Sequence, residues 1–214
     1  MVKGIIGIDP GVRRLVTWMM VDALGKPVQA WHRNGGPAMR TFIQYLGHSA
    51  NITRVQAQTA KENLITVLHE IAKEIVQRGA TYQYGIGIER LPKGQETSGM
   101  TGLFNFEQAG VMSPAQAAFF LAPFQFFYDD LIAQCRRAGI QEPVLVEPFY
   151  NSTTCPVCWH VSRHSRSGDD FRCVKCRYPA QADENAAHMI GLLAWKVLST
   201  GVMVPLEEDV RVAP

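Results

Sequence analysis

Two segments of one pattern decide the fold: IGID at residues 6–9 and IGIE at residues 86–89. Each segment is a short apolar run that ends on an acidic residue, and such runs are typical of buried β-strands. These segments form the first and fourth of five predicted strands, which are expected to be neighbours because sequential elements usually pack close together and parallel crossovers are right-handed. Open α/β sheets bind ligands at the carboxyl ends of their strands. We therefore predict two adjacent strands that present Asp9 and Glu89 at one edge of a sheet.

Turn residues and hydrophobic periodicity predict the remaining elements. The predicted strands cover residues 4–9, 15–21, 27–31, 85–89 and 144–147. The predicted helices cover residues 53–78, 113–138 with a kink at Pro123, and 181–200. Tight turns between the first three strands favour an antiparallel meander, and an intervening helix favours parallel pairing for the later ones. The fold class is therefore α/β, with a mixed five-stranded sheet flanked by helices.

A third acidic residue, Asp183, stands where the last helix begins. Each of the three acids has an ordinary reading: Asp9 opens a turn, Glu89 pairs with Arg90, and Asp183 caps a helix. Taken together they indicate chemistry, because three carboxylates with no basic residue beside Asp9 or Asp183 repel one another unless a cation neutralises them. Oxygen ligands of this kind suit two Mg²⁺ or Mn²⁺ ions, which can support phosphodiester hydrolysis.

Four of the five cysteines form two Cys-x-x-Cys pairs, Cys155 with Cys158 and Cys173 with Cys176. The spacing between the pairs is close to that of four-cysteine zinc sites, so we predict one structural Zn²⁺. A redox dithiol would explain one pair but not two. His160 and His164 lie near enough to substitute as ligands, but four thiolates already complete the site. The remaining Cys135 is predicted to lie in the core.

The chain has 214 residues and a formal net charge of +2, which by itself does not indicate a nucleic-acid partner. Basic residues do gather around the second cysteine pair, and these are Arg163, Arg166, Arg172, Lys175 and Arg177. We weigh contact with nucleic-acid phosphates about equally against an ordinary solvated surface. No apolar run approaches the roughly 20 residues of a membrane-spanning helix, so we expect a soluble, cytoplasmic protein without a membrane partner.

Five motifs in this order resemble a known family: GIDPG at residues 7–11, GIER at 87–90, NSTTCPVC at 151–158, CVKC at 173–176 and ADENAA at 182–187. They resemble the RuvC-like nuclease half of transposon-encoded TnpB proteins and the related type V CRISPR effectors. The resemblance implies an RNase H-like (RuvC-like) fold with an inserted zinc ribbon. It also implies that Asp9, Glu89 and Asp183 are the catalytic triad.

The same resemblance divides the chain into a nuclease core at residues 1–150, a zinc ribbon at 151–180, the last core helix at 181–200 and a tail at 201–214. It implies a metal-dependent DNA endonuclease of an RNA-guided system. Family members carry N-terminal domains that bind guide RNA, whereas this chain begins at the first nuclease motif, so guide RNA would bind through a missing or separate part. Two alternatives are a non-cleaving zinc-ribbon protein that acts as a repressor or transposition accessory, and a RuvC-type junction resolvase.

Overall fold

A five-stranded mixed sheet forms the centre of the computed structural model, which describes residues 2–11, 14–46, 53–90, 123–148 and 150–203. Its strands are β1 (Gly4–Pro10), β2 (Val16–Asp22), β3 (Pro27–Arg33), β4 (Tyr84–Glu89) and β5 (Val144–Val146), in the order β3-β2-β1-β4-β5. β1 is antiparallel to β2 and parallel to β4. The predicted meander, the adjacent acidic strands and the mixed five-stranded sheet are confirmed.

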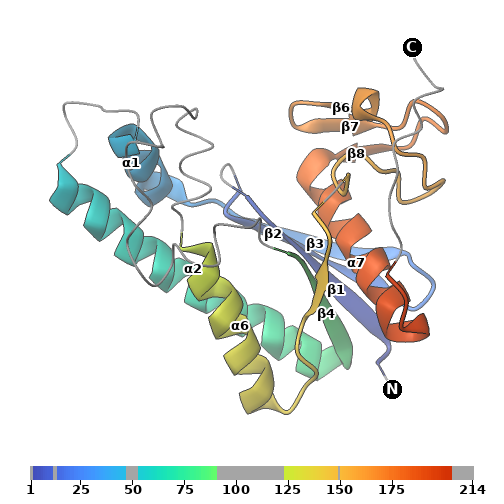
Figure 1. Ribbon diagram of the computed structural model, residues 1–214, viewed down its shortest axis with the longest axis horizontal. Coiled ribbons are helices and arrows are strands. Elements are labelled where there is room, and N and C mark those ends of the chain that lie inside the picture. Colours follow the sequence, from blue (N-terminus) through green and yellow to red (C-terminus); the bar gives the residue numbers. More distant parts are fainter. Residues whose placement is uncertain (1, 12–13, 47–52, 91–122, 149, 204–214) are drawn as a thin grey trace.

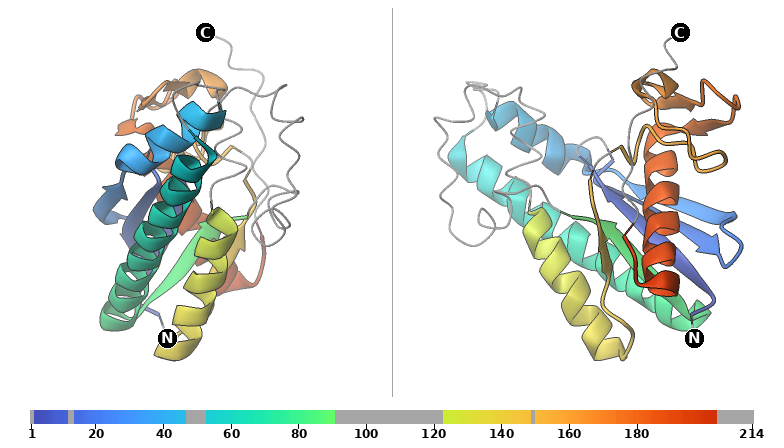
Figure 2. Two further views of the ribbon diagram at one scale, coloured as in Figure 1. Left: turned by 90° about the vertical axis from the view of Figure 1, so that its left-hand side faces the viewer. Right: turned by 45° about the vertical axis from the view of Figure 1, so that its right-hand side comes forward.

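Helices cover both faces of the sheet (Figure 1). On one face lie α2 (Arg54–Tyr82) and α6 (Phe124–Ala138), which pack with Ile6, Ile8, Ile86 and Ile88 into the larger hydrophobic core. On the other face lies α7 (Ala182–Thr200), which packs with Ile5 and its neighbours into a second core. Alternate residues of β1 thus pack on opposite faces of the sheet, as the two-residue period of a strand requires. Figure 2 shows the two helical layers from two further directions.

Glycines in the IGID and IGIE segments let α7 lie directly on the sheet. Gly7 of β1 is paired with Gly87 of β4. A Cβ atom on Gly7 would overlap the backbone of α7 at Ala187 and Gly191, and one on Gly87 would overlap the side chain of Ala194. The helix that begins beside Asp183 is therefore held against the two strands that end at Asp9 and Glu89.

The helices differ from the predicted ones in three ways. A helix α1 (Gly36–Leu46) was not predicted, and α2 continues past residue 78 to Tyr82 before Gln83 ends it in a left-handed conformation. The kink predicted at Pro123 is wrong, because Pro123 is the N-cap and α6 begins after it. A proline has no N–H and its ring restricts the residue before it, so it suits this position better than a helix interior. The predicted helical residues 113–122 lie outside the described residues.

A small three-stranded antiparallel sheet lies between β5 and α7 in the chain. It consists of β6 (Arg166–Ser167), β7 (Asp170–Arg172) and β8 (Pro179–Gln181), preceded by a 3₁₀ turn, η1 (Arg163–Ser165). β8 leads directly into α7, so the small sheet sits at the N-terminal end of that helix (Figure 1). Within the described ranges, no helix combines the length and apolar character that crossing a membrane requires.

Candidate functional site

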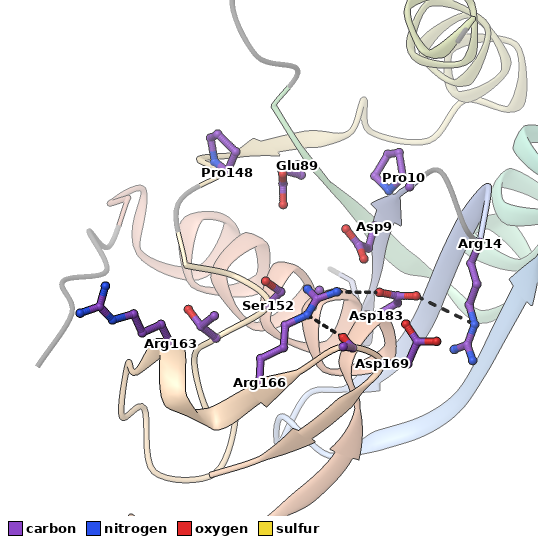
Figure 3. Close-up of a pocket in the computed structure, with 14 residues that line it drawn as sticks. Asp9, Pro10, Arg14, Glu89, Pro148, Ser152, Arg163, Arg166, Asp169 and Asp183 are labelled. Carbon is purple, nitrogen blue, oxygen red and sulfur yellow. Dashed lines mark hydrogen bonds and ion pairs between the residues drawn. The ribbon is translucent and has the colours of Figure 1, made fainter. Parts of the chain in front are cut away.

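Asp9, Glu89 and Asp183 come from three different elements and line one cleft of about 690 Å³ (Figure 3). Asp9 lies near the end of β1, Glu89 is the last residue of β4, and Asp183 is in the first turn of α7. The parallel pairing of β1 with β4 brings the first two acids to the same sheet edge, and the glycine contacts of α7 bring the third. The structure thus brings the three predicted carboxylates together.

Burial disfavours the ionised forms of Asp9 and Glu89, and the neighbouring carboxylates add to the effect at Asp9. Burial raises the pKa of Asp9 well above its ordinary value, and the charges of Glu89 and Asp183 raise it further, whereas Arg166 lowers it. Burial also raises the pKa of Glu89, from 4.5 to about 7, although a hydrogen bond from Asn151 opposes this shift. A cluster of this kind gains stability from a bound cation, because the cation offsets both the burial and the repulsion.

Two residues that the sequence analysis did not identify hold Glu89 in place. The Asn151 side-chain amide donates to Glu89 Oε2 and to the backbone carbonyl of Glu147, at 2.9 Å each. The Tyr128 hydroxyl donates to the backbone carbonyl of Glu89. Asn151 opens the segment that carries the first cysteine pair, so its motif was visible, but nothing in the sequence pairs it with a glutamate 62 residues away. No sequence signal distinguished Tyr128 from the other aromatic residues of α6.

Two arginines flank Asp183, which corrects the expectation that it has no basic neighbour. Arg166 Nη2 lies 3.5 Å from Asp183 Oδ1, and Arg14 Nε lies 3.9 Å from Asp183 Oδ2. Arg14 follows β1 by a few residues and Arg166 belongs to β6, so both are remote from Asp183 in sequence and reach it only through the fold. One of the predicted nucleic-acid contacts, Arg166, thus faces the carboxylates themselves.

The donor set of this cleft fits a hard divalent cation, because Asp9, Glu89 and Asp183 offer carboxylate oxygens, which are the ligands that such a cation prefers. The oxygens of these three carboxylates do not all lie within 4.8 Å of one another. Within the described part of the chain, four cysteines are the one group of three or more His, Cys, Asp or Glu residues whose ligand atoms all lie within 4.8 Å of one another. The oxygens of Asp9, Glu89 and Asp183 are therefore spread more widely than the four cysteine sulfurs.

The four cysteines are Cys155, Cys158, Cys173 and Cys176, and all are free thiols. The sulfur of Cys155 lies 3.5 Å from that of Cys176, and the sulfur of Cys158 lies 3.6 Å from that of Cys173. Four thiolates around one Zn²⁺ have sulfurs about 3.8 Å apart, given Zn–S distances of about 2.3 Å. The cluster therefore has the dimensions of a tetrahedral zinc site, as its spacing predicted.

The two cysteine pairs lie on turns with the same backbone hydrogen bonds. In the first turn the N–H of Trp159 donates to the carbonyl of Cys155, and the N–H of Cys155 donates to that of His160. Arg177, Cys173 and Tyr178 repeat this arrangement in the second turn. Trp159 and Arg177 both have left-handed backbones, with φ of 59° and 66°. The repeated geometry turns both pairs of sulfurs toward one point.

The local surroundings also affect how readily the thiols ionise. Burial raises the pKa values of Cys155 and Cys158, so their thiolates are unfavourable without a cation. A hydrogen bond from the backbone of Tyr178 lowers the pKa of Cys176 to about 7. His160 is outside the cysteine cluster, and Cys135 is buried in the larger core, both as predicted.

The predicted basic residues divide into two groups. Arg163 and Arg166 line the carboxylate cleft (Figure 3). The other three, Arg172, Lys175 and Arg177, are exposed on the small sheet and the second cysteine turn. Both therefore border the cleft, and Figure 3 shows the guanidinium of Arg166 facing Asp183 while that of Arg163 points away from the three carboxylates.

Part of the chain matches a known family model. Residues 124–190, which include α6, the cysteine cluster and Asp183, match the family model "Cas12f1-like, TNB domain". No curated protein sequence matches the chain.

Among solved structures, the chain is similar to Cas12f1 in a complex with sgRNA and target DNA, with a TM-score of 0.60 and 18% identity over 88% of this chain and 49% of that one. It is also similar to the mini-RNA-guided endonuclease CRISPR-Cas phi3, with a TM-score of 0.54 and 10% identity over 96% of this chain and 46% of that one. The chain thus spans about half the length of these two proteins. The resemblance predicted from the motifs is therefore confirmed: this chain resembles the TnpB-like type V CRISPR effectors, in its family-model match and in its fold.

Proposed function

We propose that this chain is the RuvC-like nuclease part of a TnpB or type V effector protein, and that it hydrolyses DNA phosphodiesters with divalent metal ions. The observation that carries the proposal is the meeting of Asp9, Glu89 and Asp183 at one open cleft, with the pKa values of Asp9 and Glu89 raised. Ordinary surface acids would keep their usual pKa values. Buried, mutually repelling carboxylates in a cleft are typical of a functional site.

We assign an RNase H-like fold to the core, residues 1–150 together with the helix at 181–200, a zinc ribbon to residues 151–180, and a tail to 201–214. The mixed sheet and the likeness to the Cas12f1 and CRISPR-Cas phi3 structures support the core assignment. The separate three-stranded sheet and the cysteine cluster support the ribbon.

Asp9, Glu89 and Asp183 would hold two Mg²⁺ or Mn²⁺ ions. Such ions, when bound, activate water and stabilise the leaving oxygen of an in-line phosphoryl displacement. The protein's own contribution is to position the ligands. Asn151 and Tyr128 fix the side chain and the backbone of Glu89, and α7 carries Asp183 to the ends of β1 and β4.

The four cysteines would hold one Zn²⁺ with a structural role, because a closed four-thiolate site leaves no position for a substrate. The ribbon that this ion closes carries Arg166, which faces Asp183, and begins at Asn151, which binds Glu89. Zinc would therefore act on the active site indirectly, by keeping these two side chains in place.

DNA is the proposed substrate, with phosphates of one strand entering the cleft beside Arg163 and Arg166. The exposed Arg172, Lys175 and Arg177 would extend this positive surface along the ribbon. The similar Cas12f1 structure is a complex with sgRNA and target DNA, and from it we infer guide RNA as a further partner. Because this chain spans about half of that protein, guide RNA would bind chiefly to a part outside these residues.

The proposal is tested by incubating the protein with labelled single-stranded, duplex and four-way DNA in Mg²⁺, Mn²⁺ or EDTA. We expect cleavage of single strands in either metal, no cleavage in EDTA, and none by Asp9→Asn. The control Asp170→Asn removes an exposed ribbon acid and should cleave normally.

Two other outcomes correspond to other functions. Tight DNA binding without cleavage in any metal would contradict the nuclease proposal and favour a repressor or transposition accessory. Preferential cutting of four-way DNA would favour a junction resolvase instead.

A further inference from the structure

Asp183 is the one carboxylate of the triad whose two oxygens each face a guanidinium group among the described residues. Arg166 Nη2 approaches Oδ1 at 3.5 Å, and Arg14 Nε approaches Oδ2 at 3.9 Å. Figure 3 shows both side chains reaching Asp183 from different sides of the cleft. The Asp183 side chain is only 18% exposed, so surrounding residues exclude most of the solvent that would otherwise screen its charge.

The contact of Arg166 is suited to exchange rather than to permanent pairing. Strong hydrogen bonds between a guanidinium and a carboxylate have N···O distances of about 2.7–2.9 Å, and this contact is longer. Arg166 is tethered to its own ribbon instead, because its Nε donates to the carbonyl of Gly168 at 3.1 Å. Its side chain is 32% exposed and lines the open cleft, so the guanidinium can leave Asp183 without crossing the core.

We propose that Arg166 is a resident cation of the carboxylate site: it neutralises Asp183 in the metal-free protein and leaves Asp183 when a divalent cation binds. This inference rests on the proposed function, since it requires that Asp9, Glu89 and Asp183 bind such a cation. The inference goes beyond the proposed function because it assigns Arg166 a role in the metal-free protein, in which its contact with Asp183 competes with metal binding.

The exchange follows from the chemistry of the two cations. A guanidinium cannot lose its proton in a protein and has no lone pair to offer a metal, so it cannot become a ligand. It repels a divalent cation beside Asp183, and the repulsion is strong because the site is partly buried. A divalent cation and the Arg166 contact therefore compete for the same carboxylate. Once released, Arg166 still lines the cleft, where its fork of donors suits a phosphate.

The two possible roles of Arg166 predict opposite changes in metal affinity when its charge is removed. If Arg166 only supported the fold of the site, removing its charge would weaken metal binding or leave it unchanged. If it is a resident cation, removing its charge tightens metal binding, because nothing has to be displaced. The test therefore measures metal affinity in the absence of nucleic acid, without reference to cleavage.

The experiment titrates Mn²⁺ into the zinc-loaded protein and follows free Mn²⁺ by electron paramagnetic resonance. We expect Arg166→Gln to bind Mn²⁺ about tenfold more tightly than wild type, and Arg166→Lys, which keeps the charge, to remain near wild type. The control Arg136→Gln removes an arginine of α6 that forms an exposed ion pair with Glu142, and it should leave the Mn²⁺ affinity unchanged.

Equal or weaker Mn²⁺ binding by Arg166→Gln would overturn the inference while leaving the proposed function intact. No Mn²⁺ binding by wild type or variant would overturn both.

A second readout uses thermal unfolding. Arg166→Gln should unfold at a lower temperature than wild type in EDTA and at the same temperature in saturating Mn²⁺, because its charge is needed only while no metal is bound. A variant that is destabilised equally in both conditions would show a structural role and contradict the exchange.

Discussion

Replacing Glu89 by glutamine should stabilise the metal-free protein at alkaline pH, which is an unusual effect for a candidate catalytic residue. The pKa of this carboxyl rises from 4.5 to about 7 on folding, mainly through burial. Between these values the folded protein binds more protons than the unfolded chain, so the free energy of unfolding falls as pH rises through this range. Above pH 7 the full cost of the buried charge is present, and it amounts to about 3 kcal/mol.

The glutamine side chain would carry no charge and could still accept the hydrogen bond from Asn151 through its amide oxygen. In EDTA at pH 8 we expect Glu89→Gln to be more stable than wild type by about 3 kcal/mol, or about 6–12 °C in Tm for a chain of this size. At pH 4, where the carboxyl is protonated in both states, the gain should vanish. Calorimetry or circular dichroism across this pH range measures the effect.

The control Glu147→Gln removes a nearby acid whose side chain is 47% exposed and paired with Arg90, and its effect should stay small at both pH values. The reasoning would be refuted if Glu89→Gln were no more stable than wild type at pH 8, or if its gain were the same at pH 4. Either result would mean that folding does not raise the pKa of this carboxyl.

Three further variants test the packing of α7, the zinc site and the basic residues of the ribbon. Gly7→Ala should destabilise the fold by about 3 kcal/mol or more, because its Cβ would overlap the backbone of α7, and urea unfolding measures this loss. We expect elemental analysis to find one equivalent of zinc in wild type and none in Cys173→Ser, and finding no zinc in wild type would contradict the ribbon. Arg166→Ala combined with Arg172→Ala should flatten the slope of log affinity against log salt for single-stranded DNA by about 1.4, whereas an unchanged slope would leave these side chains as solvated surface.

The sheet and the meeting of the acids were predictable because local patterns express them. The strands that end at Asp9 and Glu89 are short, apolar and bounded by turns, and adjacent parallel strands end at the same sheet edge. The glycines of these segments carried more information than the prediction used, since they are what allows α7 to approach. Helix α1 escaped prediction, although its residues lie between two elements that were predicted.

The surroundings of the acids could not be predicted from local patterns. Arg14 and Arg166 reach Asp183 from separate parts of the chain, and Asn151 reaches Glu89 across 62 residues. Such pairs depend on how the ribbon and α7 are placed against the sheet, and a single sequence contains no signal for that placement. The cysteine cluster is the contrasting case, because its ligands lie at short fixed spacings on two similar turns that fold locally.

The most direct test of the metal-centre proposal is an anomalous-scattering map from crystals of the zinc-loaded protein soaked in Mn²⁺, collected at the manganese edge. We expect density for one or two Mn²⁺ ions among the side-chain oxygens of Asp9, Glu89 and Asp183, and none in crystals of Asp9→Asn treated identically. Wild-type crystals with no Mn²⁺ at these three carboxylates, or with Mn²⁺ bound there equally in Asp9→Asn, would contradict it.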